Sequence, residues 1–263
     1  MSAILKHAIR LLTLSLLLPF SGALYADYTI EEAINEAGRQ RMLTQRIVKS
    51  YTQLGLGVAD ERSRAELRYA LELFESQQDR LYQLDSVPEV QSQLARIEGV
   101  WGSFQRLATS EADPQRAKAL MVMSGVLLSQ CNKLVSLLEE AAGSQLGTLI
   151  NIAGRQRMLS QRLAAFYLMR SWGIEHPALD PGIRNTRAEF DKSQAVLKKH
   201  TLDNLEIGEQ LSKIDQEWAW FTSALEQTGD QRYNLVVMDA SEQLLHSLEY
   251  LVALYELSAS SKP

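Results

Sequence analysis

Residues 34–51 read INEAGRQRMLTQRIVKSY, and residues 150–167 read INIAGRQRMLSQRLAAFY. The two segments are identical at twelve of their eighteen positions, whereas unrelated segments of average composition would share about one. Apolar and small residues recur in both at spacings of three and four, which is the period of one face of an α-helix. The chain therefore contains an internal duplication whose best preserved part is a helix.

The duplication continues downstream of these helices at an offset of 116 or 117 residues. Trp101 and Phe104 correspond to Trp218 and Phe221, and their i, i+3 spacing predicts that they lie on a core face. Further along, residues 115–116 and 231–232 both read Gln-Arg, which aligns the last part of the two copies at an offset of 116. The repeated unit is therefore a whole module.

Each module reads as four helices, because prolines stand at helix starts and glycines at connections. The short connections favour antiparallel neighbours. We expect the fourth helix of the first module to run almost directly into the second module, since only Gly143 and Gly147 interrupt the pattern. The expected fold is all-α: two tandem antiparallel four-helix bundles, at residues 27–142 and 143–263. The predicted helices cover residues 29–55, 62–85, 88–109, 114–142, 145–173, 181–201, 203–227 and 230–258.

The first 26 residues differ from the rest of the chain. Lys6 and Arg10 precede an apolar run at residues 11–20, and small residues follow as far as Ala26. This order is typical of a secretory signal peptide, and the apolar run is too short to span a bilayer comfortably. No other stretch approaches transmembrane length by inspection. We predict cleavage after Ala26 and a soluble periplasmic protein; the alternative is an uncleaved N-terminal anchor.

Composition narrows the possible partners. Of the 263 residues, 46% are apolar and 22% charged, as in a soluble globular protein. The net charge is −5, and becomes −7 without Lys6 and Arg10. A net acidic protein is not expected to bind nucleic acid, so any attraction for an anion must be local. Cys131 is the only cysteine, which excludes an intrachain disulfide.

One arginine interrupts the apolar face of each repeated helix. Arg41 and Arg157 stand at equivalent positions of the two packing faces, three residues after Gly38 and Gly154. A guanidinium keeps its proton, so burial on such a face requires an anionic or strongly accepting partner. The glycines lack side chains that would block a ligand or a neighbouring helix. Two interpretations stay open: an ion pair with an acidic residue of a neighbouring helix, or a bound anion.

Other polar residues of the repeated helices fall on nearly the opposite side. For these we predict structural hydrogen bonds or carboxylate pairs within their own module. The adjacent acidic residues Glu139 and Glu140 are predicted to form a solvated helix face. The opposite-side set comprises Asn35, Arg39, Arg46, Asn151, Arg155 and Arg162.

The repeated motif resembles that of a known group of sensors. The string A-G-x-x-R-M, preceded by I-N, resembles the signature of nitrate/nitrite sensor kinases of the NarX type. The fuller string I-N-x-A-G-R-Q-R-M-L-[ST]-Q-R resembles the PilJ-type sensor module of pilus-linked chemotaxis transducers. The resemblance covers nearly the whole chain after residue 26. It implies a periplasmic four-helix bundle that pairs with a second bundle through the first helices.

The same resemblance implies a ligand and the residues that bind it. In the nitrate sensors one nitrate lies between two bundles, held by the motif arginine and by backbone around the motif glycine. Carried over by motif position, the candidate ligand-binding residues are Gly38, Arg41, Gly154 and Arg157. A single chain with both copies would then build the site that the kinases build by dimerising. Because the Arg-Gln between glycine and arginine differs from the kinases, the resemblance does not fix the choice of anion.

Enzyme chemistry is not expected. His176, His200 and His246 lie on different predicted elements without metal-ligand spacing, and no nucleophile, phosphate or cofactor motif is present. We expect a periplasmic sensor of a small anion, with nitrate or nitrite favoured and no cofactor or metal. It would act through a membrane partner, since nothing resembling a transmembrane hairpin or kinase core follows the second module. The alternative is a ligand-free interaction module that docks on a sensor kinase, chemotaxis transducer, transporter or pilus-associated system. Whether the motif helices pair within one chain or across a homodimer stays open.

Overall fold

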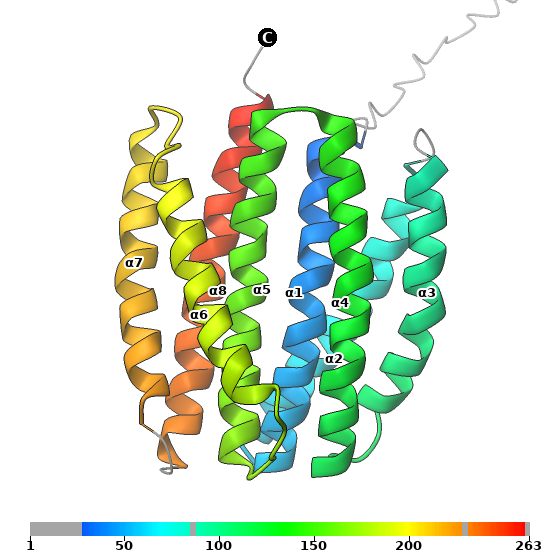
Figure 1. The fold of residues 1–263 in the computed structure, drawn as a ribbon, viewed down its shortest axis with the longest axis vertical. Coiled ribbons are helices and arrows are strands. Elements are labelled where there is room, and N and C mark those ends of the chain that lie inside the picture. Colours follow the sequence, from blue (N-terminus) through cyan, green and yellow to red (C-terminus); the bar gives the residue numbers. More distant parts are fainter. Residues whose placement is uncertain (1–27, 85–87, 228–230, 261–263) are drawn as a thin grey trace, which may run out of the picture.

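The computed structural model describes residues 28–260 except 85–87 and 228–230, so the predicted signal peptide lies outside the described residues. Within the described residues all regular structure is helical, which confirms the all-α prediction (Figure 1). The elements are α1 (Ile30–Leu56), α2 (Asp60–Leu81), α3 (Pro88–Ala108), α4 (Pro114–Ala142), α5 (Gln145–Ser171), α6 (Leu179–Leu197), α7 (Leu205–Leu225) and α8 (Arg232–Ser260).

The helices form two four-helix groups that meet at the centre of the molecule. In the first group α1 packs on α2 and α4, and α3 packs on α4. The second group repeats this pattern, with α5 packed on α6 and α8, and α7 on α8. Between the groups, α1 and α5 lie side by side and run in the same direction (Figure 1). The two motif helices therefore pair within one chain.

Local signals set most helix ends where the sequence predicts them. Thr29 and Glu32 form the capping box at the start of α1, and Asp113 caps α4. At the junction of the two groups the helices end and begin where the sequence predicts, at residues 142 and 145. Gly143, at φ 57°, ends α4 in the left-handed conformation, and Ser144 caps α5 at once. The chain therefore reverses direction between α4 and α5, and Gly147 lies within α5.

The pattern of buried residues corrects the alignment between α4 and α8, the last helices of the two groups. All ten buried residues of α4 have a buried counterpart 117 positions later in α8, as Leu120 and Leu134 have in Val237 and Leu251. The offset of 116 taken from the repeated Gln-Arg pair is therefore wrong for these helices. The error arises because exposed residues carry little packing constraint and can match by chance.

Equivalent side chains hold the two groups together internally. The Gln40 side chain donates to Gln78 at 2.8 Å between α1 and α2. In the second group Gln156 donates to Gln194 at 2.9 Å between α5 and α6. The predicted core position is confirmed for three of the four aromatic residues, since Trp101, Phe104 and Phe221 are buried. Trp218 is only partly buried, and its indole N–H donates to Asp191 at the surface.

Contrary to the sequence expectation, α4 is long and apolar enough to cross a membrane by length and composition, alone among the described helices. A core helix of a soluble protein has the same composition. One face of α4 is buried against α1 and α3, which accounts for most of its apolar residues.

Candidate site between the paired helices

The two motif arginines converge where α1 and α5 meet. Arg41 is 2% exposed and Arg157 is fully buried. A methyl group placed on Gly38 would lie 3.4 Å from Nη2 of Arg41 and 3.6 Å from Nη2 of Arg157. Placed on Gly154, it would lie 3.2 Å from Nη2 of Arg157 and 3.7 Å from Nη2 of Arg41. Both guanidinium groups therefore reach the same small region between the two glycines.

Each arginine reaches across to backbone of the opposite motif helix. Nη2 of Arg41 donates to the carbonyl oxygen of Asn151 at 3.3 Å, and Nη2 of Arg157 donates to that of Asn35 at 3.3 Å. Arg157 also donates to Oδ1 of Asn35 at 2.7 Å. Arg41 has only a long contact of 3.5 Å with Oδ1 of Asn132 on α4. The two halves of the site are thus similar in backbone contacts and different in side-chain contacts.

Neither guanidinium group is in direct contact with a carboxylate of the described residues, and no ion pair in that part of the chain includes Arg41 or Arg157. Nε of Arg41, and Nε and Nη1 of Arg157, are buried without a hydrogen-bond partner. Such unpaired buried donors are costly, and an anion is the partner that would satisfy them.

Burial also changes the acidity of the two groups. It lowers the pKa of Arg41 to about 10 and that of Arg157 to about 9. The nearby charges of Arg155, for Arg41, and of Arg39, for Arg157, act in the same direction. The charged form of each side chain is therefore held in surroundings that disfavour it.

Three of the four outer arginines of the motif pair with carboxylates, as predicted, but not always within their own module, and the fourth, Arg162, instead donates to Oε1 of Gln45 on α1 at 3.4 Å. Arg155 of α5 pairs with Glu189 of α6, inside the second group. Arg39 and Arg46 of α1 instead pair with Glu249 and Glu242 of α8, in the opposite group. These ion pairs between the two groups leave no local signal in the sequence, because the helices that form them are far apart along the chain.

Two further predictions need correction at this site. Asn35 was expected on the far side of its helix, but its Oδ1 accepts a hydrogen bond of 2.7 Å from Arg157 of the opposite motif helix, and its amide lies beside Glu256. Glu139, expected to be solvated, accepts a hydrogen bond of 2.6 Å from Nδ2 of Asn151. The geometry of a single helix does not predict these contacts, because the partners of both residues lie in the opposite group.

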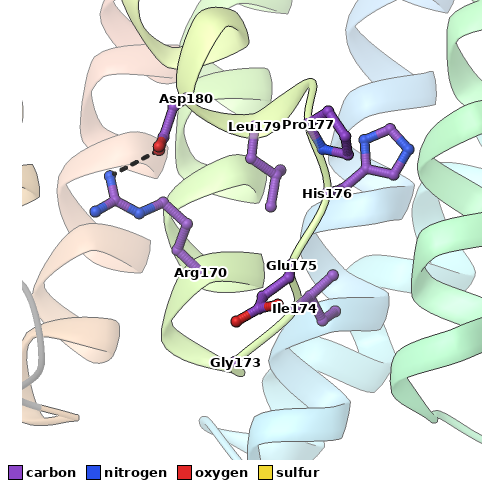
Figure 2. Close-up of a pocket in the computed structure, with 8 residues that line it drawn as sticks. All are labelled: Arg170, Gly173, Ile174, Glu175, His176, Pro177, Leu179 and Asp180. Atoms are coloured by element: carbon purple, nitrogen blue, oxygen red, sulfur yellow. Dashed lines mark ion pairs between the residues drawn. The ribbon is translucent and has the colours of Figure 1, made fainter.

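A surface cavity of about 670 Å³ lies elsewhere, at the connection of α5 and α6 (Figure 2). Arg170 and Asp180 form an ion pair of 3.6 Å on one side of it, and His176 stands on the connecting loop at the other. The cavity is at the C-terminal end of α5, about four turns beyond Arg157. It is therefore separate from the arginine pair.

Comparison with known proteins assigns the chain to a family. The family described as the type IV pili methyl-accepting chemotaxis transducer N-terminal domain, PilJ, matches residues 30–123 and again residues 142–244. The methyl-accepting chemotaxis protein McpN of Pseudomonas aeruginosa is 32% identical over 142 residues. That match covers 51% of this chain and only 27% of McpN. No solved structure matches the chain. The two matched segments cover most of the chain, and the protein therefore belongs to the PilJ family of chemotaxis-transducer sensory domains, with the family domain present in tandem.

Proposed function

We propose that the protein is a periplasmic sensor of a small anion, nitrate or nitrite, which binds between α1 and α5. The observation that carries this proposal is the convergence of two buried guanidinium groups, Arg41 and Arg157, with unpaired N–H groups and no carboxylate partner. The candidate ligand-binding residues remain Gly38, Arg41, Gly154 and Arg157. Domain boundaries at residues 27–142 and 143–263 belong to the same proposal.

A small planar oxyanion suits this arrangement. Each of its oxygens accepts hydrogen bonds, and a guanidinium presents its donors in a plane. The two glycines leave room for it, because a methyl group at either position would stand within 3.7 Å of both Nη2 atoms. A single negative charge would offset part of the repulsion between two buried cations and so favour the packed form of α1 and α5. We propose that this tightening is what a membrane partner detects.

Calorimetric titration of the protein lacking residues 1–26 tests the proposal. Nitrate and nitrite are the ligands, and chloride and sulfate at matched ionic strength are the controls. We expect binding of nitrate or nitrite at one anion per chain, abolished by Arg41→Ala and by Arg157→Ala. Arg170→Ala is the matched control, because Arg170 lies on the same helix, far from the glycines, and is exposed and paired with Asp180. Equal binding by all three variants and the wild type would contradict the proposed site.

One observation supports the alternative, a helical module that docks on another protein without a ligand. Val122 and Val126, on the outer face of α4, are 53% and 49% exposed. The alternative predicts no heat and no thermal stabilisation with any of the four anions. It also predicts that charged substitutions at these two valines, and not at the arginines, abolish function in the cell.

A further inference from the structure

Each buried arginine is approached by a carboxylate of its own group, through an asparagine of the opposite group. Asn35 on α1 lies beside Glu256 of α8 and acts as a donor that lowers the pKa of the Glu256 carboxyl, and Oδ1 of the same Asn35 accepts from Arg157 at 2.7 Å. A chain of contacts therefore runs from Glu256 through Asn35 to Arg157. It connects α8 and α5 by way of the motif helix α1.

The duplication provides a second copy of this arrangement. In the register fixed by burial, Glu139 of α4 is the counterpart of Glu256 of α8, 117 positions earlier. Glu139 accepts from Nδ2 of Asn151, which is the counterpart of Asn35. Arg41 reaches the backbone oxygen of that asparagine. The same two residue types thus occur at equivalent places on both sides of the arginine pair.

The two copies are in different states. On the α8 side the amide oxygen of Asn35 is bonded to Arg157. On the α4 side the amide oxygen of Asn151 is buried without a partner, and the guanidinium of Arg41 does not reach it. An unsatisfied buried amide oxygen next to an incompletely bonded guanidinium is costly, and a modest movement of either group would pair them. The two arrangements therefore show a closed and an open form of one contact.

We propose that Glu139 and Glu256 are positioning residues of the anion site, which hold the two asparagine amides and counterbalance the arginine charges when no anion is bound. This inference rests on the proposed function, since it concerns the affinity of that site. A carboxylate behind each arginine stabilises the empty state and opposes a second negative charge between the arginines. Anion affinity is therefore set by these two acidic residues as well as by the arginines.

Several charged groups surround Glu256. Glu32 and Arg39 of α1 and Arg157 of α5 act on it. Burial raises the pKa of the Glu256 carboxyl above its ordinary value, although Asn35 and the two arginines oppose this. Acidification would protonate Glu256, remove its negative charge and strengthen anion binding.

The test is a titration of nitrate, as its sodium salt at fixed ionic strength, from pH 7.5 to pH 5. Nitrate keeps its single charge over this range, so a change in affinity belongs to the protein. We expect the wild type to bind more tightly as the pH falls. We expect Glu256→Gln to bind about five- to tenfold more tightly at pH 7.5 and to lose the pH dependence. Gln retains an oxygen that accepts from Asn35, so the variant removes the charge and keeps the hydrogen bond.

Three controls make the outcome decisive. Glu139→Gln is expected to tighten binding in the same direction, and Glu140→Gln, one residue away and exposed, to leave it unchanged. His200 is the histidine to control for, because its backbone oxygen accepts from Tyr255, which neighbours Glu256. His200→Gln is expected to keep the pH dependence. Unchanged affinity in both Glu256→Gln and Glu139→Gln would overturn the inference, as would an equal gain in Glu140→Gln. Absence of nitrate binding in the wild type would instead overturn the proposed function.

Discussion

At the scale of single residues, the candidate site holds two buried positive charges close together, which is unfavourable for the protein without an anion. Arg41 and Arg157 are buried, their pKa values are lowered by that burial, and several of their N–H groups lack partners. Removing one partner from a buried charge usually costs several kcal/mol, whereas replacing the charge by an apolar group is often neutral or stabilising. Stability and anion binding should therefore respond oppositely to substitution at these arginines.

Replacement of Arg157 by methionine separates the two effects. Methionine fills a similar volume without a charge, so we expect Arg157→Met to raise the free energy of unfolding of the anion-free protein by about 1–2 kcal/mol. The same variant should lose nitrate binding. Thermal unfolding with and without nitrate measures both. Arg170→Met is the control, because Arg170 is exposed at the far end of the same helix. A less stable Arg157→Met that still binds nitrate would contradict the argument.

The motif glycines allow a second separation of stability from binding. An alanine stabilises a helix interior by about 0.5–1 kcal/mol relative to glycine. At Gly154, however, the added methyl group would lie 3.2 Å from Nη2 of Arg157, within the proposed anion position. We expect Gly154→Ala to fold with near wild-type stability and to bind nitrate at least tenfold more weakly, as measured by calorimetry.

The matched control is Gly99→Ala, since an added methyl group there meets no atom within 4 Å. This variant should gain the helix stabilisation and keep wild-type nitrate affinity. Equal nitrate affinities in Gly154→Ala and Gly99→Ala would show that the region between the arginines is not where the anion binds.

At the scale of helices, an ion network fixes α1 against α8. The fully buried Lys49 of α1 and the neighbouring Arg46 both pair with Glu242 of α8. The equivalent positions on the other side of the molecule are Ala165 and Gly125, which cannot form such a pair. The two halves therefore differ at the contact between α1 and α8.

Glu242 gives a pH-dependent contribution whose sign follows from its surroundings. Burial acts to raise the pKa of Glu242, but the charges of Lys49 and Arg46 outweigh it and hold the pKa below its ordinary value of 4.5. A carboxyl with a lowered pKa stabilises the folded state above the ordinary value, and this stabilisation is lost as the pH falls through the folded-state pKa. The contribution is therefore complete at pH 7 and disappears in acid.

Urea denaturation at pH 7 and pH 3 checks this contribution. We expect Glu242→Gln to lower the free energy of unfolding by about 3 kcal/mol at pH 7, because Lys49 loses its closest partner in a buried position. At pH 3 the difference from the wild type should shrink. Glu249→Gln is the control, since its contact with Arg39 is long, at 3.9 Å, and partly exposed, so it should change stability by less than about 1 kcal/mol. A pH-independent loss in Glu242→Gln would contradict the ionic explanation.

The helices themselves could be predicted from the sequence because their signals are local. Capping residues such as Thr29 and Asp113, and the 3–4 spacing of apolar residues, act within one or two turns. The arginines Arg41 and Arg157 could be singled out for the same reason, as charges on an apolar face. The pairing of Asn35 with Glu256, 221 positions away, leaves no such signal, since it exists only once α1 meets α8. Contacts between the two halves therefore had to come from the structure.

At the scale of the whole molecule, the two bundles bring both halves of the candidate site together without a second chain. We expect one nitrate per chain in calorimetry and a monomer in light scattering with and without nitrate. At a nitrate concentration 100 times the dissociation constant, the free energy of unfolding should rise by about 2.7 kcal/mol. One anion per two chains, with a dimer in solution, would move the site to an interface between molecules.

The two-residue turn at Gly143 and Ser144 has a consequence for the cell. A receptor that assembles its binding site from two separate chains loses sensitivity when few copies are made, since unpaired chains cannot bind. Here the second half is always at the high effective concentration that a short tether imposes. For the proposed anion site, the anion concentration that gives half-occupancy should therefore be independent of the expression level, so that a cell with few copies would respond at the same threshold.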